Sequence, residues 1–285
     1  MRYHAIFPQT EIGNDPAVIA TFVREVEAMG FDGLVVYDHV VGADPGRPNW
    51  KGPYTIATPF HEVFVLLAFC AAITSRLELA TGVLILPQRQ TTLVAKQAAS
   101  LDVLSGGRLR LGVGVGWNWV EFDALGMSFH DRGKRIEEQV ALLRKLWTEE
   151  SVTFEGRWHQ IDRAGLNPLP VRRPIPLWMG ADSERAIRRV ARLADGFFAH
   201  FAATDEGRAG AAQFWEWVDE AGRPRGDVGL ECRFGPTLSD DEVARTASAF
   251  REMGATDFQF ATMRAGFRSV DEHLESLRRQ KDRAG

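Results

Sequence analysis

The sequence predicts an α/β protein in which eight parallel strands close into a (β/α)8 TIM barrel with an insertion after the fourth strand. Short apolar runs rich in β-branched residues alternate with longer stretches of helical periodicity along the whole chain. This alternation favours a parallel sheet, and eight such units in 285 residues fit a closed barrel better than an open sheet. No segment rich in Pro, Gly and Ser separates two halves, so we expect one domain over residues 1–285.

In the first half, each short apolar strand is followed by a helix. The expected strands cover residues 3–8, 33–37, 77–86 and 109–115. The expected helices cover residues 15–29, 58–75 and 92–104. Asp15 offers an N-cap side chain to the first helix, Pro16 suits its first turn, and Gly30 can close it.

The second half repeats this scheme around an insertion. Residues 132–148 predict a long amphipathic helix, and residues 152–160 predict a small hairpin, with Gly156 at its turn, in a segment that runs to Pro176. Four further strands are expected at 176–179, 196–199, 229–234 and 257–261. The helices after them are expected to begin near Ser183, Thr204, Asp240 and Val270.

Composition excludes several classes of protein. The chain is 45% hydrophobic, which is too apolar for a disordered protein, and its net charge of −4 gives no reason to expect nucleic acid or an anionic membrane as a partner. Two cysteines cannot build a disulfide framework or a four-thiolate zinc site. The longest apolar run, residues 63–73, is too short to span a bilayer. The N-terminus does not resemble a signal peptide, so we expect a cytoplasmic protein.

In such a barrel the active site lies at the carboxyl ends of the strands. Titratable and cationic residues follow several strands there: Asp38, His39, His200, Arg233 and Arg264. Imidazole is the side chain best suited to moving protons near neutral pH, and the neighbouring carboxylate of Asp38 can hold the tautomer of His39. A purely structural role for this pair is equally open.

Glycines also gather at the expected strand ends. Gly112, Gly114 and Gly116 leave one face of the fourth strand free of side chains, so that a flat ring or another backbone can approach, although tight packing alone would explain them too. They are not a dinucleotide fingerprint, because Trp117 or Trp119 stands where the last glycine would be. These two tryptophans either pack in the core or rim or stack against a ring.

The segment from Gly180 to Ser183 places backbone N–H groups at a helix start, which favours an anion unless Asp182 or Ser183 simply caps the helix. The histidines show no ligand-like spacing, and His4 stands alone where metal-dependent barrel hydrolases have an H-x-H pair. We therefore expect no metal site.

Residues 81–126 (TGVLILPQRQTTLVAKQAASLDVLSGGRLRLGVGVGWNWVEFDALG) resemble the signature region of the luciferase-like monooxygenase family. Asp38-His39, residues 132–137, Leu146-Trp147 and residues 174–198 agree with this resemblance, which covers most of the chain to about residue 200. The sequence is similar in particular to the actinobacterial branch that depends on the deazaflavin coenzyme F420.

The resemblance implies a homodimeric barrel that binds a flavin or deazaflavin ring at the strand ends. By position, Asp38 would hydrogen-bond the ring edge and His39 would act as acid and base. Gly82 and Val83 match the place where relatives carry a bulge with a non-prolyl cis peptide bond behind the ring. Further cofactor contacts would come from Gly116 and Asn118 and, for the phosphate, from Gly180, Ala181, Asp182 and Ser183.

The chain departs from the pattern of the deazaflavin dehydrogenases at one position. Trp117 stands where those relatives carry an acidic residue, so the second proton-transfer role is vacant or moves to Glu121. For this reason a sugar-phosphate substrate is not carried over.

We therefore predict an oxidoreductase that uses F420, or FMN as the second choice, on a small organic substrate. Trp117, Trp119, His200 and the loop at 40–57 would form the pocket walls. Arg233 or Arg264 would meet an anionic group of the substrate. With FMN the protein would be a monooxygenase served by a separate reductase. Two other classes stay open: a barrel that carries a cofactor without catalysis, and a metal-dependent hydrolase.

Overall fold

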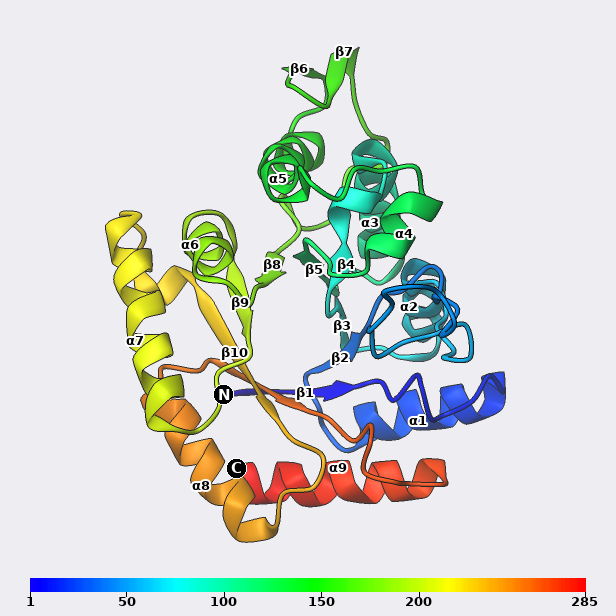
Figure 1. Ribbon diagram of the computed structural model, residues 1–285, viewed down its shortest axis with the longest axis vertical. Helices are drawn as coiled ribbons and strands as arrows, with labels where there is room; N and C mark the ends of the chain where they lie inside the picture. The colour runs from blue at the N-terminus through cyan, green and yellow to red at the C-terminus, as the bar shows by residue number, and fades with distance from the viewer.

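The computed structural model describes residues 1–285 and confirms the closed (β/α)8 barrel, with the helices on the outside of the ring of strands (Figure 1). Strand order is β3-β2-β1-β11-β10-β9-β8-β5, every pair is parallel, and a further pairing of β3 with β5 closes the ring. The ring strands are β1 (Arg2–Ile6), β2 (Gly33–Val36), β3 (Glu78–Thr81), β5 (Leu109–Gly114), β8 (Leu177–Gly180), β9 (Gly196–Ala199), β10 (Gly229–Phe234) and β11 (Asp257–Phe260). No helix is both long enough and apolar enough to cross a membrane.

Several helices begin at residues whose side chains cap them. The Asp15 side chain accepts a hydrogen bond from the N–H of Ala17 at 2.8 Å, and Ser269 and Glu272 form a capping box at the start of α9. The helices are α1 (Pro16–Ala28), α2 (Val63–Ile73), α3 (Thr91–Leu104), α4 (Trp119–Ala124), α5 (Arg132–Thr148), α6 (Glu184–Leu193), α7 (Asp205–Glu220), α8 (Asp240–Glu252) and α9 (Val270–Ala284), with short 3-10 turns η1 (Leu86–Gln88) and η2 (Arg225–Asp227).

Two local predictions are wrong. The second helix begins at Val63 and not near residue 58, because Glu62, with its side chain bonded to the N–H of Val65, is the N-cap. The third strand does not run unbroken from 77 to 86. It is interrupted at a cis peptide bond between Gly82 and Val83, which confirms the cis bond that the family resemblance implies there, and β4 (Leu84–Ile85) then pairs with β5. The structure also contains a short helix that the sequence analysis did not predict, α4, which Asn118 caps.

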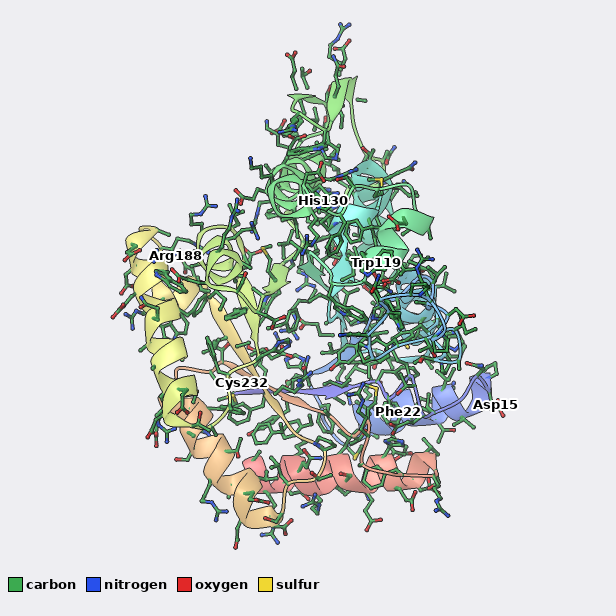
Figure 2. All side chains as sticks on the ribbon, viewed as in Figure 1. Asp15, Phe22, Trp119, His130, Arg188 and Cys232 are labelled. Carbon is green, nitrogen blue, oxygen red and sulfur yellow. The ribbon has the colours of Figure 1, made fainter.

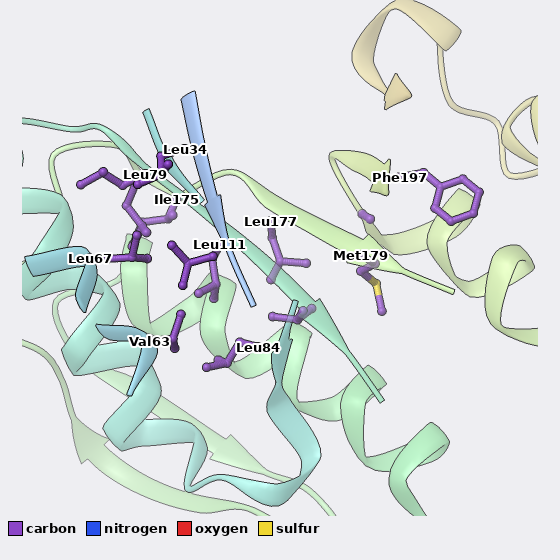
Figure 3. Packing of buried hydrophobic residues seen from close by; sticks show 14 of the residues in the cluster. Leu34, Val63, Leu67, Leu79, Leu84, Leu111, Ile175, Leu177, Met179 and Phe197 are labelled. Carbon is purple, nitrogen blue, oxygen red and sulfur yellow. The ribbon is translucent and has the colours of Figure 1, made fainter. Parts of the chain in front are cut away.

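The two faces of the strands have different neighbours. On β11, Phe258 and Phe260 belong to a core of 62 buried residues. Figure 3 shows members of this core packed between strands and helices. Asp257 and Gln259, which alternate with them, face the barrel axis. Side chains thus fill the middle of the ring as well as its outside (Figure 2).

The predicted insertion after the fourth strand contains α4, α5 and an antiparallel hairpin of β6 (Val152–Glu155) and β7 (Gln160–Ala164). Glu138 of α5 holds the hairpin turn: its carboxylate accepts the backbone N–H groups of Arg157 and Trp158 at 2.8 and 2.9 Å, and lies 2.7 Å from Nδ1 of His159. The hairpin projects from α5 away from the ring (Figure 1).

Candidate active site

A cavity of about 570 Å³ opens at the carboxyl ends of the strands, in the size range of small-molecule sites. It brings together segments that are far apart in the sequence. Most of the residues predicted for the site line it, namely Asp38, His39, Gly82, Val83, Gly116, Trp117, Asn118, Glu121, Gly180, Ala181, Asp182, Ser183, His200 and Arg233.

His39 is held by a carboxylate from another element. Its Nδ1 lies 3.0 Å from Oε2 of Glu121 on α4, and Oε1 of the same carboxylate accepts the N–H of Val40 at 2.6 Å. Glu121 is 1% exposed, so these N–H groups replace water around its charge. Because an ionised carboxylate only accepts, Nδ1 of His39 carries the hydrogen, which leaves Nε2 as the nitrogen able to take up a proton.

Asp38 does not hold this tautomer, contrary to our expectation from its position in the sequence. One carboxylate oxygen accepts the N–H of Ile85 at 3.0 Å and the other accepts from Nη2 of Arg89 at 2.6 Å. Burial raises the pKa of Asp38, and the positive charge of Arg89 opposes part of that effect. The carboxylate of Asp38 therefore fastens the start of η1 to the end of β2.

The glycines of the strand ends leave room for parts of the protein itself. A Cβ on Gly114 would lie 2.5 Å from Cγ2 of Val83, and a Cβ on Gly180 would lie 3.2 Å from its Cγ1. A Cβ on Gly112 would lie 2.0 Å from the carbonyl oxygen of Thr81. Of the two explanations, close packing is what the structure shows, and its result is that the valine after the cis bond lies in the cavity wall.

Two features at the α6 side of the cavity suit an anion. Ser183 precedes α6, but its side chain makes no capping hydrogen bond. Oδ1 of Asp182 lies 2.5 Å from Nδ1 of His200 instead. Simple capping is therefore not what these residues do. Arg132 also lines the cavity and forms no ion pair: its guanidinium donates to the carbonyl oxygens of Gly116 and Phe129 at 3.2 and 2.8 Å.

An aromatic cluster covers the His39 side. The ring centroid of His39 lies 4.9 Å from Tyr54, 4.8 Å from Phe60 and 5.6 Å from Trp117. Trp50 packs against Trp117 at 5.7 Å, so the loop at 40–57 contributes to this wall as expected, although Tyr54 is its only residue in the cavity lining.

Two predicted pocket residues lie outside the cavity lining. Trp119 is turned away, with the guanidinium of Arg47 over its ring at 4.7 Å. Arg264 does not line the cavity, and its guanidinium lies 5.9 Å from the ring centroid of Tyr54, which does. Both predictions relied on nearness in sequence to a strand end, which does not fix the direction of a side chain.

Sequence analysis missed several lining residues, among them Tyr37, Phe129, Arg132, Glu231 and Gln259. Tyr37 and Glu231 could have been found, because they alternate along their strands with the predicted site residues His39 and Arg233. Arg132 had no such signal, since its place depends on how α5 packs.

Comparison with known proteins agrees with this geometry. The model of the luciferase-like monooxygenase family matches residues 4–284. The chain belongs to this family. An uncharacterized protein of Mycobacterium tuberculosis (strain ATCC 25618 / H37Rv) is 37% identical over 200 residues, which are 67% of this chain and 68% of that protein.

Two further comparisons concern F420. An F420-dependent glucose-6-phosphate dehydrogenase of Nakamurella multipartita is 34% identical over 186 residues, 64% of this chain and 51% of that enzyme. The coenzyme F420 dependent tetrahydromethanopterin reductase from Methanopyrus kandleri superposes with a TM-score of 0.77 at 16% identity, covering 97% of both chains. At that identity, the likeness to the reductase shows the fold alone. Members of the family are oxidoreductases or monooxygenases.

Proposed function

We propose that this luciferase-like protein is an oxidoreductase that binds coenzyme F420 in the cavity and transfers a hydride to or from a small organic substrate. The observation that carries the proposal is that His39, Val83 and the start of α6 line one cavity. When bound, the deazaflavin supplies two-electron hydride chemistry. The protein orients the reactants, excludes water and delivers protons.

The residues present fit such a cofactor. The uncapped N–H groups at the start of α6, together with Arg132, suit a phosphate group. Val83, with Gly114 and Gly180 beside it, would contact the face of a planar ring. Asp38 would support the ring indirectly, because its carboxylate holds the backbone of Ile85. We also propose that the same carboxyl group hydrogen-bonds the edge of the ring.

Proton transfer in this proposal belongs to His39. Glu121 is a positioning residue, because it holds Nδ1 and leaves Nε2 free to exchange a proton with the substrate. The aromatic rings of Tyr54, Phe60 and Trp117 surround the imidazole and exclude water from it. A mostly apolar substrate fits this side, and Arg233, which also lines the cavity, would meet an anionic group.

Equilibrium titration of the purified protein with F420 and with FMN tests the proposal. We expect tighter binding of F420, and a loss of about tenfold or more in Arg132→Ala, because a charge-assisted hydrogen bond to phosphate is removed. The matched control is Arg157→Ala on the hairpin, which should bind as the unaltered protein does. Binding of neither cofactor would refute the proposal, and stoichiometric zinc or manganese would instead indicate a hydrolase.

FMN is the second candidate, since the family includes monooxygenases. Tighter binding of FMN would favour a monooxygenase that receives reduced flavin from a separate reductase. Binding of either cofactor without turnover of any substrate would favour a carrier protein.

We also propose a homodimer formed through α2 and α3. Helix α2 (VFVLLAFCAAI) carries no charged residue, although Val65 and Phe69 are 69% and 37% exposed, and Leu93 on α3 is 52% exposed. Sedimentation analysis tests this: Val65→Glu should give monomers, whereas Val171→Glu, at a 58% exposed position outside these helices, should not. A monomeric unaltered protein would contradict it.

A further inference from the structure

Tyr37 and Gln259 line the cavity, and the proposed function gives neither of them a role. Tyr37 follows β2, and Gln259 lies on β11. Arg233 on β10 is beside Gln259, because the register of the two strands pairs these residues. The strands β2, β1, β11 and β10 are neighbours in the sheet, so the three side chains belong to one arc of the ring.

The backbone of Tyr37 is held on both sides by one buried amide. Oε1 of Gln9 accepts the N–H of Tyr37, and Nε2 of Gln9 donates to its carbonyl oxygen, both at 2.9 Å. A Cβ on Gly82 would lie 3.7 and 3.8 Å from Cδ1 and Cε1 of the Tyr37 ring. The phenol is therefore fixed next to the residue that precedes Val83, in the wall proposed to contact the cofactor ring.

The hydroxyl group of Tyr37 has a hydrogen to spare. Its oxygen accepts a hydrogen bond from Nη1 of Arg233 at 3.3 Å. Because a guanidinium only donates, the hydroxyl hydrogen is directed elsewhere, and no protein group accepts it. Burial raises the pKa of Tyr37, and the charge of Arg233 opposes part of this effect, so the hydroxyl keeps its hydrogen at neutral pH. Tyr37 can therefore donate to a molecule in the cavity.

Arg233 has a charge without a partner. It forms no ion pair, and its guanidinium has further N–H groups that no protein group accepts. The charge of Arg233 lowers the pKa of Asp182, after the larger effect of a hydrogen bond from His200, but the carboxylate of Asp182 lies 2.5 Å from His200 and not against Arg233. A free guanidinium in a cavity lining suits an anionic group of a ligand.

Gln259 adds an unsatisfied amide to this arc. It is 7% exposed and lines the cavity, and its side-chain amide forms no hydrogen bond within the protein. Its neighbours Phe258 and Phe260 face the outer core, so Gln259 faces the axis. A polar group buried to this extent usually has a partner, and here a bound molecule would supply it.

The charged groups beneath the cavity pair with one another. Arg110 is 1% exposed and lies 2.8 Å from Glu231 and 3.3 Å from Asp257. His4 lies 2.7 Å from the same oxygen of Asp257. Arg110 therefore offsets the negative charge of Glu231, which also lines the cavity, and Arg233 stays the cation of this arc that has no carboxylate partner.

On the basis of the proposed function, we propose that its substrate is an organic acid and that Tyr37, Arg233 and Gln259 hold the carboxylate. Because the donor atoms of Tyr37 and Arg233 are 3.3 Å apart, the two oxygens of one carboxylate can accept from both. Nε2 of Gln259 is the third donor. A carboxylate is ionised at neutral pH and only accepts, which matches three donors and one positive charge. The aromatic cluster around His39 would contact the apolar body of the acid.

Calorimetric titration of the cofactor-free protein with benzoate and with benzamide tests the proposal. The two probes have nearly the same shape, and we expect benzoate to bind about tenfold or more tightly, because only benzoate is charged. Tyr37→Phe keeps the ring beside Gly82 and should weaken benzoate binding by about 3- to 10-fold, the effect of one hydrogen bond. Arg233→Ala should weaken it by about tenfold or more. The matched control is Arg268→Ala, at an exposed position outside the cavity lining, which should bind as the unaltered protein does.

Equal affinity for the two probes would overturn the proposal, and so would unaltered benzoate binding in Tyr37→Phe and Arg233→Ala. A second titration at saturating F420 separates substrate from cofactor. Benzoate should still bind there, whereas competition between the two would assign these side chains to the cofactor and overturn the proposal. If neither F420 nor FMN binds, the proposed function fails, while the titration of the cofactor-free protein still decides whether the three side chains hold a carboxylate.

Discussion

Replacing Gly114 by alanine tests whether the strand-end glycines exist to seat Val83. A Cβ on Gly114 would lie 2.5 Å from Cγ2 of Val83, whereas carbon atoms in contact are normally about 3.5 to 4.0 Å apart. Val83 would have to move by about 1 Å, and such overpacking costs about 1–3 kcal/mol. We expect Gly114→Ala to lower the free energy of unfolding by that amount and to weaken cofactor binding, because the displaced side chain lies in the cavity wall.

Gly180 provides the graded comparison. Its Cβ would lie 3.2 Å from Cγ1 of Val83, so Gly180→Ala should cost less, about 1 kcal/mol or below. Val83→Ala removes both contacts, and in the double variant with Gly114→Ala the loss should be smaller than the sum of the single losses.

Urea unfolding of these variants, with cofactor titration of each, measures the effects. Strict additivity of Gly114→Ala and Val83→Ala would refute the reasoning. Unaltered stability of Gly114→Ala would refute it too.

Four further changes address the site and the barrel axis. His39→Ala should keep cofactor affinity but slow the single-turnover hydride step by about 10²- to 10⁴-fold, and an unchanged rate would remove His39 from the mechanism. Glu121→Gln should slow the same step while its pH profile shifts, because the amide no longer fixes the His39 tautomer; a rate and profile like those of the unaltered protein would contradict this role. Arg132→Ala should make cofactor affinity less sensitive to salt, measured against Arg157→Ala, since one phosphate contact is lost. For Asp257, burial raises the pKa, but the hydrogen bond from the histidine beside it and the charge of the buried arginine lower it to about 2 from 3.8. The resulting stability is present above pH 4 and lost as the pH falls toward 2, so the unaltered protein should lose about 2 kcal/mol more over this range than Asp257→Asn, and equal losses would refute the assignment.

The barrel could be predicted because each strand is a short apolar run that ends at a turn. Gly33–Val36 is buried throughout, as its composition indicates. The start of α2 could not be placed, since Thr58-Pro59 is as good a helix signal as Glu62, and only packing decides between them. The break after β3 has no signature in hydrophobic periodicity, and only the family resemblance marked Gly82 and Val83.

The sequence predicted which residues line the site better than it predicted which of them contact each other. His39 and Glu121 are 82 residues apart, and nothing local in the sequence shows that α4 carries the carboxylate back to β2. Glu231 and Arg110 were missed for another reason. Charged residues that alternate with apolar ones in a strand usually face water. In a closed barrel the second face of each strand points to the barrel axis, where buried charged groups need partners of opposite charge.

The way the hairpin is fastened also limits what it can do. Glu138 ties the turn at Arg157 and Trp158 to α5, and no residue between 150 and 176 lines the cavity. Tyr54 and Trp117, whose ring centroids lie 6.3 Å apart, belong to the cavity wall, and this arm does not. Exchanging the exposed residues of β6 and β7 should leave substrate choice intact, so that this arm is a place where a reporter group or a surface tether can be attached.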